Sequence, residues 1–227
     1  MRTKVLLTRL WPHAVLNPMS EKYDITFDSG DRPLPAAVLH QAMAMFDVIC
    51  AMITDCFERS IFEQSKRWVR LIANFGAGVE HIDLAAANQV GAIVTNTPNV
   101  LTQSTAELAL LLMLMTARRA AEGERQLCAA RWPGCHPTHM TGRSIYGKRL
   151  GLIGYGRIAQ ATAKMAKALW DMETGYYGWR CMERTSGIME AAHFSSLPVL
   201  LESSNVVSVH CTGGAEPHHL LNAPMLA

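Results

Sequence analysis

The segment 148–159, KRLGLIGYGRIA, restricts the possible folds of this chain more than any other stretch. Its order is typical of a short apolar strand, a glycine turn and the start of a helix, which together can place a dinucleotide pyrophosphate at a helix N-terminus. Gly154 would allow the tight turn, and Gly156 would let the backbone approach the phosphates without a Cβ between them. Ala159 replaces the usual third glycine and is small enough for close helix–strand packing. The segment therefore predicts dinucleotide binding by an α/β domain.

Strand-like and helix-like runs alternate along the chain. The expected strands are 4–10, 23–27, 47–52, 70–74, 92–96, 149–154, 172–177 and 206–211. The expected helices among them are 36–45, a helix that Asp83 could cap, and 158–169. This alternation indicates parallel sheets with helices on both faces. The segment 96–99 contains a proline and interrupts the pattern, so we expect two α/β units joined near residues 97–104.

A long apolar helix should follow this interruption. Ser104 and Glu107 have the spacing of a capping box, and the sequence LALLLMLMTARRA after them is apolar on nearly all sides. We therefore expect this helix to be largely buried, either between domains or between subunits. An irregular connection should then run from Arg131 to about Gly147.

Composition and charge exclude several classes of protein. Hydrophobic residues make up 49% of the 227 residues and the formal net charge is +2, which favours a packed chain without a nucleic-acid partner. The apolar run 108–117 is too short to span a bilayer, and the N-terminal apolar run is too short for a signal peptide. The six cysteines include no C-x-x-C pair, so we expect reduced thiols and no metal site. The resulting expectation is a cytoplasmic protein with no membrane partner.

Four motifs occur in order along the chain: NFGAGVEHID at 74–83, VTNTPNVLT at 94–102, TAELA at 105–109 and GKRLGLIGYGRIA at 147–159. In order and spacing, they resemble the D-isomer-specific 2-hydroxyacid dehydrogenases, especially the glyoxylate/hydroxypyruvate reductase branch, from about residue 45 onward. The resemblance implies a flavodoxin-like substrate-binding domain at 1–98 and a Rossmann-type, doubly wound NAD(P)-binding domain at 99–227, with substrate in the cleft between them. It also implies hydride transfer between nicotinamide and a small 2-keto or 2-hydroxy acid, such as glyoxylate or hydroxypyruvate.

The turn Gly76-Ala77-Gly78 resembles the family loop whose backbone N–H groups hold the substrate carboxylate, which makes Ala77 and Gly78 the candidate substrate contacts. Successive N–H groups form an anion-binding concavity, and small residues leave those groups accessible. The alternative interpretation is an ordinary strand-to-helix turn. His81, in the same motif, is interpreted as structural.

The resemblance implies cofactor contacts at Thr105, Gly154, Gly156, Arg157, Ile158, Arg180 and Cys211. Arg157 and Ile158 follow the glycine turn, where family members cover the pyrophosphate with N–H groups; the alternative for Arg157 is a solvated arginine at a helix start. Thr105 could contact cofactor, cap the long helix, or do both. Cys211 is expected to contact cofactor through its backbone, because no base is placed to activate its thiol. Thr212 stands where relatives have proline.

The residue after the second Rossmann strand distinguishes NAD from NADP. An acidic residue there hydrogen-bonds the ribose 2′-OH of NAD, whereas a nearby arginine accommodates the 2′-phosphate of NADP. Gly178 stands where the acid is expected, and Arg180 follows it. The sequence therefore favours NADP while leaving NAD open.

No catalytic residue is assigned within this chain. The family's reaction uses an arginine that binds the substrate, a histidine that acts as general acid/base, and an acidic residue that orients the histidine. In the family, all three follow the segment that 220–227 resembles. We therefore expect a truncated chain with an incomplete Rossmann sheet and little or no turnover, an expectation that clear oxidation of NADPH or NADH with glyoxylate would refute.

Two alternatives stay open. A non-catalytic dinucleotide-binding module of the corepressor type would bind cofactor without turnover. A truncated product that folds poorly would expose apolar faces and lack a cooperative thermal transition. In the family a homodimer forms through the long helix, here residues 104–127. Neither the exact substrate nor the cofactor is determined by the sequence.

Overall fold

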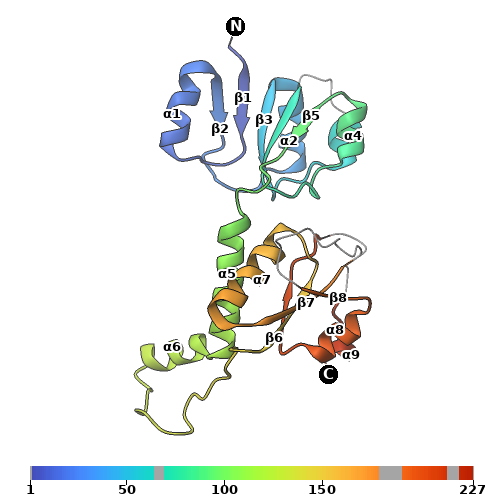
Figure 1. Ribbon diagram of the computed structural model, residues 1–227. Helices are drawn as coiled ribbons and strands as arrows, with labels where there is room; N and C mark the ends of the chain where they lie inside the picture. The colour runs from blue at the N-terminus through green and yellow to red at the C-terminus, as the bar shows by residue number, and fades with distance from the viewer. Residues whose placement is uncertain (1, 64–68, 179–190, 214–219, 227) are drawn as a thin grey trace. The chain divides into compact units, whose positions relative to one another are not determined.

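The computed structural model describes residues 2–63, 69–178, 191–213 and 220–226 (Figure 1). The chain divides into two units, Met1–Val100 and Leu101–Ala227, and each unit has its own parallel sheet and its own core. Within the described residues, no helix combines the length and the apolarity needed to cross a membrane. The functions expected for the domains at 1–98 and 99–227 stay predictions.

The described part of the first unit forms a parallel sheet with the strand order β2-β1-β3-β4-β5. Its strands are β1 (Lys4–Leu7), β2 (Asp24–Phe27), β3 (Val48–Met52), β4 (Leu71–Phe75) and β5 (Ile93–Thr95). Its helices are α1 (His13–Lys22), α2 (Ala36–Met45), α3 (Arg59–Glu63) and α4 (Leu84–Gln89). This strand order is that of the flavodoxin-like fold, which confirms the expected class.

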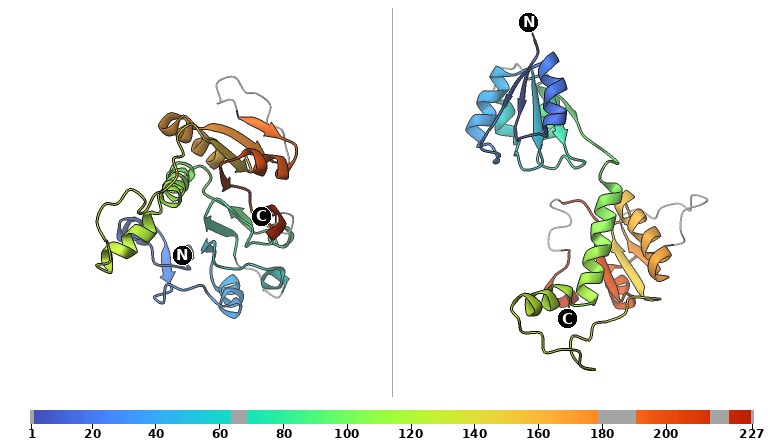
Figure 2. Two further views of the ribbon diagram at one scale, coloured as in Figure 1. Left: turned by 90° about the horizontal axis from the view of Figure 1, so that it is seen from below. Right: turned by 90° about the vertical axis from the view of Figure 1, so that its left-hand side faces the viewer.

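Both faces of this sheet are covered by helices, as Figure 2 shows. Along β1, Val5 and Leu7 pack with residues of α1, whereas Leu6 packs with residues of α2, as the alternation of side chains along a strand requires. A parallel sheet buried on both faces explains why its strands are continuous apolar runs. Asp83 caps α4 as expected, because its carboxylate accepts a hydrogen bond from the N–H of Ala86 at 2.8 Å.

The described part of the second unit forms a parallel sheet with the order β8-β7-β6-β9. Its strands are β6 (Arg149–Ile153), β7 (Glu173–Tyr177), β8 (Ala192–Phe194) and β9 (Val206–Val209). Its helices are α5 (Thr102–Ala117), α6 (Ala120–Cys128), α7 (Arg157–Trp170), α8 (Leu197–Ser203) and α9 (Ala223–Leu226). In order of appearance the strands are arranged 3-2-1-4, as in the Rossmann fold, so this expectation is also confirmed.

The long apolar helix differs from its prediction in where it begins and where it ends. It begins at Thr102 with Leu101 as N-cap, so the capping box at Ser104 is wrong: the Ser104 hydroxyl instead donates back to the Leu101 carbonyl at 3.3 Å. Thr105 therefore lies within the first turn and does not cap the helix. The predicted helix 104–127 is in fact α5 and α6, separated at Arg119, whose φ is +55°.

Burial of α5 is also one-sided. Leu110 and Met113 pack with α7 in the core of the second unit. The opposite row, Leu108, Leu111 and Leu112, is 51–54% exposed. The expectation of a largely buried helix therefore holds for one face, and the other face is an exposed apolar row, called here the α5 leucine row.

Candidate functional site

The glycine turn of the second unit joins β6 to α7. Gly154 has a φ of +86°, a conformation that side-chain-bearing residues rarely adopt. Its N–H donates to the Tyr177 carbonyl at 2.7 Å, and a Cβ at this position would lie 2.8 Å from the backbone N of Cys211. The turn is therefore packed between the ends of β7 and β9, and glycine is the residue that fits there.

Gly156 has a different role from Gly154. It is the N-cap of α7 with an ordinary φ of −76°, and a Cβ built on it would meet nothing within 4 Å. The first N–H groups of a helix have no acceptor within the helix, and Gly156 supplies no side chain to cap them. Amide donors that face open space at the N-terminus of a 14-residue helix fit a pyrophosphate. The geometry of this turn is therefore suited to a pyrophosphate.

Neighbouring residues hold the turn in shape. The Gln160 side chain donates from Nε2 to the Tyr155 carbonyl at 3.1 Å. Ala159 is fully buried, which agrees with the need for a small residue where α7 meets the sheet. Arg157 and Ile158 are the first two residues of α7, and the Arg157 side chain is exposed. Both positions are therefore adjacent to the open space at the helix start.

The other predicted cofactor residues lie in different places. Gly178 directly follows β7, and a Cβ on it would meet nothing within 4 Å. Cys211 lies beside Gly154 through its backbone. Arg180 lies outside the described residues, so the structure does not place it. Within the described ranges, no three His, Cys, Asp or Glu side chains are grouped to hold a metal ion, and the described cysteines are free thiols.

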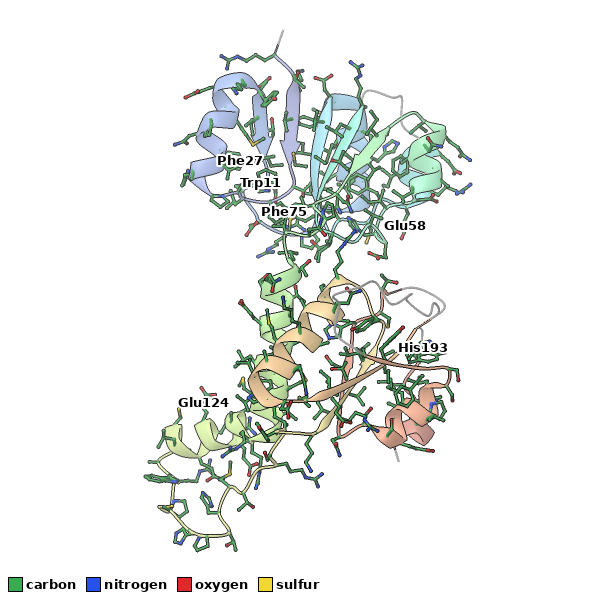
Figure 3. All side chains as sticks on the ribbon, in the orientation of Figure 1. Trp11, Phe27, Glu58, Phe75, Glu124 and His193 are labelled. Carbon is green, nitrogen blue, oxygen red and sulfur yellow. The ribbon has the colours of Figure 1, made fainter. Side chains whose placement is uncertain are left out.

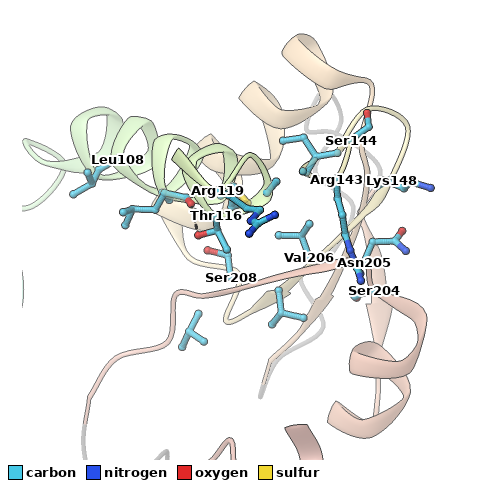
Figure 4. A pocket seen from close by; sticks show the side chains of 18 of the residues that line it. Leu108, Thr116, Arg119, Arg143, Ser144, Lys148, Ser204, Asn205, Val206 and Ser208 are labelled. Atoms are coloured by element: carbon cyan, nitrogen blue, oxygen red, sulfur yellow. Dashed lines mark hydrogen bonds between the residues drawn. The ribbon is translucent and has the colours of Figure 1, made fainter. Parts of the chain in front are cut away.

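A cavity of about 1300 Å³ lies along α5 and β9 (Figure 4). Of the predicted cofactor contacts, its lining includes Thr105 but neither glycine of the turn. In the described residues β9 pairs with β6 and has no strand on its other side, which leaves this side of the sheet open. The lining reaches His210, whose backbone packs against Gly154, and it includes two residues of the α5 leucine row, Leu108 and Leu112.

In the first unit, the loop 76–78 follows β4 at the carboxyl edge of the sheet. No described residue accepts a hydrogen bond from the N–H of Ala77 or Gly78. A Cβ on Gly76 would lie 2.5 Å from Cγ2 of Ile53, so a larger residue would not fit without displacing it. Phe75 packs against Trp11 at the same edge, with ring centroids 5.6 Å apart (Figure 3). The loop therefore presents amide donors beside apolar side chains, an arrangement suited to a carboxylate.

Sequence reasoning missed two residues of this loop environment. Asn74 is 2% exposed, and its side chain bonds to loop carbonyl groups. Asn96, from the segment after β5, also bonds to a loop carbonyl. The only signal for them was their place inside the motifs NFGAGVEHID and VTNTPNVLT. His81, interpreted as structural, contacts Asn74 at 3.0 Å.

Two histidines make the stability of the units depend on pH. Burial lowers the pKa of His81 in the first unit and of His210 in the second below the ordinary value of 6.5. For His81, the nearby carboxylates of Glu80 and Asp55 act in the opposite direction but less strongly. Since the unfolded chain binds more protons than the folded chain below pH 6.5, the free energy of unfolding falls as the pH drops from about 7 to about 5.

The test is urea unfolding at several pH values for the native chain and for His210→Gln. Glutamine keeps a partner for the Ser208 hydroxyl, which lies 3.0 Å from Nε2 of His210, but does not titrate. We expect the pH dependence of the second unit to become shallower in this variant. The same exchange at the exposed His13 is the matched control. An unchanged pH dependence in His210→Gln would contradict the assignment.

Known proteins resemble this chain over both of its units. A family model described as D-isomer specific 2-hydroxyacid dehydrogenase, NAD binding domain, matches residues 110–227. The glyoxylate reductase of Pyrococcus horikoshii is 32% identical over 230 residues, covering 100% of this chain and 68% of that protein. The glycerate dehydrogenase of Hyphomicrobium methylovorum is 29% identical, covering 97% of this chain and 69% of that protein.

A solved structure agrees with these sequence matches. The TT0316 protein of Thermus thermophilus has a TM-score of 0.87 and 33% identity, covering 98% of this chain and 69% of that one. The family model spans β6, the glycine turn and α7, where the geometry suits a dinucleotide. The chain therefore belongs to the D-isomer-specific 2-hydroxyacid dehydrogenase family, and its second unit contains the family's nicotinamide-dinucleotide-binding domain.

Proposed function

We propose that the protein is a reductase that uses a nicotinamide dinucleotide to interconvert a small 2-keto acid, of the glyoxylate or hydroxypyruvate type, and its 2-hydroxy acid. The observation that carries the proposal is the glycine turn, where the φ of +86° at Gly154 and the open space at Gly156 suit a pyrophosphate. The bound dinucleotide supplies or accepts the hydride. Relatives described as glyoxylate reductase and glycerate dehydrogenase support the substrate class.

In this proposal, the loop 76–78 of the first unit binds the substrate carboxylate. It is supported by the N–H groups of Ala77 and Gly78, from which no described residue accepts a hydrogen bond. Ala77, Gly78 and the cofactor contacts predicted at Thr105, Arg157, Ile158 and Cys211 are the residues we propose for the two ligands. No catalytic residue is assigned among the 227 residues.

Dinucleotide binding is the direct test. Titration of the chain with NADH and NADPH, followed by cofactor fluorescence, is expected to show saturable binding. Oxidation of the reduced cofactor on addition of glyoxylate or hydroxypyruvate would show the reductase activity directly, and it would overturn the expectation of little or no turnover that follows from the lack of an assigned catalytic residue. Binding without turnover is expected both of a chain without an assigned catalytic residue and of the corepressor-type module, and none of the relatives named above supports the latter.

We also propose a preference for NADP, which rests on Gly178 in the place where an acid would meet the ribose of NAD. Gly178→Asp should raise the affinity for NADH relative to NADPH by at least about tenfold, because a carboxylate accepts the 2′-OH and repels a 2′-phosphate. A Cβ fits at this position without a close contact, so the variant should fold. The ratio of dissociation constants is the readout, and Gly178→Asn is the uncharged control. An unchanged ratio would show that Gly178 does not lie beside the ribose.

We also propose a cytoplasmic location, which the free thiols of the described cysteines favour.

A homodimer is the last part of the proposal. The support for the dimer is the α5 leucine row, because exposed apolar rows of this kind mark association surfaces. Leu111→Asp should convert dimer to monomer in sedimentation experiments at micromolar concentration. Val15→Asp, at an exposed apolar position on α1, is the matched control. A native chain that sediments as a monomer would exclude this surface.

A further inference from the structure

The three consecutive carbonyl groups of the loop 76–78 are each held by an asparagine side chain. Nδ2 of Asn74 donates to the Gly76 carbonyl at 3.2 Å and to the Gly78 carbonyl at 2.7 Å. Nδ2 of Asn96 donates to the Ala77 carbonyl at 2.8 Å. The Gly76 carbonyl also accepts the N–H of Thr97 at 3.0 Å. The loop is therefore tied through its carbonyl groups to residues at the ends of β4 and β5.

Asn74 uses both amide hydrogens and its oxygen in this role. The side-chain amide has two hydrogens, and both serve loop carbonyls. Its oxygen Oδ1 lies 3.0 Å from Nε2 of His81, which can donate a hydrogen bond to it. Because only the NH2 group can donate to a carbonyl, the direction of the amide is determined, and His81 must carry its hydrogen on Nε2. Asn74 is 2% exposed, so water does not compete for these bonds.

This arrangement separates the two kinds of polar group in the loop. Carbonyl oxygens would repel a carboxylate, and here they are engaged by the asparagines. The N–H groups of Ala77 and Gly78 have no acceptor among the described residues. Donors that are fixed before an anion arrives bind it more tightly than donors that must first be ordered.

We propose that Asn74 is a positioning residue that holds the loop in its anion-binding form, with His81 fixing the direction of the Asn74 amide and Asn96 holding the third carbonyl. This inference rests on the proposed function, because it takes the loop as the carboxylate site. Asn74 acts through the backbone of Ala77 and Gly78 and does not itself contact the carboxylate.

One charged group opposes binding at this loop. Glu80 is exposed, and one of its carboxylate oxygens lies against the place where a Cβ on Gly78 would be. Its negative charge repels an incoming carboxylate. Removal of that charge should therefore strengthen binding, whereas loss of the Asn74 donors should weaken it.

The test is a titration of the ¹⁵N-labelled 227-residue chain with sodium glyoxylate and, separately, sodium acetate, followed by the amide resonances of Ala77 and Gly78. The native chain should show saturable shifts at these two amides with both carboxylates. Asn74→Asp keeps the size of the side chain and an oxygen for His81 but loses both donors, and it should weaken binding at least about tenfold. Glu80→Gln should strengthen binding severalfold.

The controls separate positioning from folding. The double variant Asn74→Asp with Glu80→Gln keeps the net charge around the loop, so binding that stays weaker in it than in the native chain reflects the lost donors. Asn88→Asp adds a charge on the exposed surface of α4 and should bind as the native chain does. If Asn74→Asp does not fold, the pair His81→Leu and His81→Gln replaces it. Leucine leaves Oδ1 of Asn74 without its donor and should weaken binding, while the amide of glutamine should restore it.

The outcomes separate the role of Asn74 from the proposed function on which it rests, the binding of a carboxylate by the loop 76–78. Absence of a saturable shift at Ala77 and Gly78 in the native chain would overturn both the carboxylate site and the role of Asn74. Native binding that persists undiminished in a folded Asn74→Asp variant, or in His81→Leu, would overturn the role of Asn74 alone. Weaker binding in Asn74→Asp at unchanged melting temperature would support it, because a merely structural role would change the melting temperature.

Discussion

Gly156→Ala is expected to leave the second unit as stable as the native unit while weakening NADH binding by at least about tenfold. Gly156 has an ordinary φ of −76°, and an added Cβ would meet no atom within 4 Å, so the folded chain accepts alanine. The same methyl group would stand at the N-terminus of α7, where we propose that the backbone approaches the pyrophosphate. Fluorescence titration measures the binding, and a thermal melt measures the stability.

Gly154→Ala is the informative contrast. Its φ of +86° and the 2.8 Å approach of a Cβ to the backbone N of Cys211 both disfavour alanine in the folded state. We expect this variant to lower the free energy of unfolding of the second unit by about 1–3 kcal/mol and also to weaken NADH binding. A Gly156→Ala chain that binds NADH as tightly as the native chain would show that the pyrophosphate does not lie over this turn.

Arg9→Met is expected to lower the free energy of unfolding of the first unit by about 3–5 kcal/mol. Asp55 is fully buried, and its carboxylate lies 3.1 Å from Nη1 of Arg9, whose side chain is 10% exposed. The carboxylate also accepts the N–H of Met52 at 2.9 Å and of Leu34 at 3.3 Å. Loss of the guanidinium would leave a buried negative charge without its cation. Urea unfolding followed by circular dichroism measures the loss.

The double variant Arg9→Met with Asp55→Asn tests the cause. Asparagine keeps an oxygen for the backbone N–H groups but carries no charge, so the double variant should regain more than half of the lost stability. Arg59→Met removes the cation of an ion pair to Asp83 in which Arg59 is 56% exposed, and it should cost no more than about 1 kcal/mol. A loss in Arg9→Met as small as in Arg59→Met would show that the buried pair does not stabilise the unit.

Much of the fold was predictable because its signals are local. The helix α2 has the predicted bounds, and the strands β1, β6 and β9 lie within the predicted segments. Alternating strands and helices imply parallel sheets, whatever the order of the strands. The family resemblance supplied that order, and the structure confirms β2-β1-β3-β4-β5 and β8-β7-β6-β9.

The predictions were wrong at several helix ends, and one helix was not predicted. Ser104 and Glu107 have the spacing of a capping box, yet α5 begins before them, at Thr102. A φ of +55° at Arg119 interrupts the predicted helix, and the neighbouring residues Arg118 and Ala120 do not indicate this break. The helix α1 carries no buried residue and contains Pro18, so neither periodicity nor propensity indicated it. Leu16 and Met19 of α1 pack, partly buried, against the core around Val5 and Leu7, a contact that the local sequence does not show.

By itself, the sequence indicated the two candidate sites whose parts are contiguous. The turn around Gly154 and the loop 76–78 each lie within one short segment, so the need for glycine and for free N–H groups can be seen in the order of residues. Tertiary structure decided what depends on strand pairing: Arg9 meets Asp55, and Asn96 meets Ala77. Partners so far apart in the chain become neighbours only when parallel strands align their carboxyl ends at one edge of a sheet.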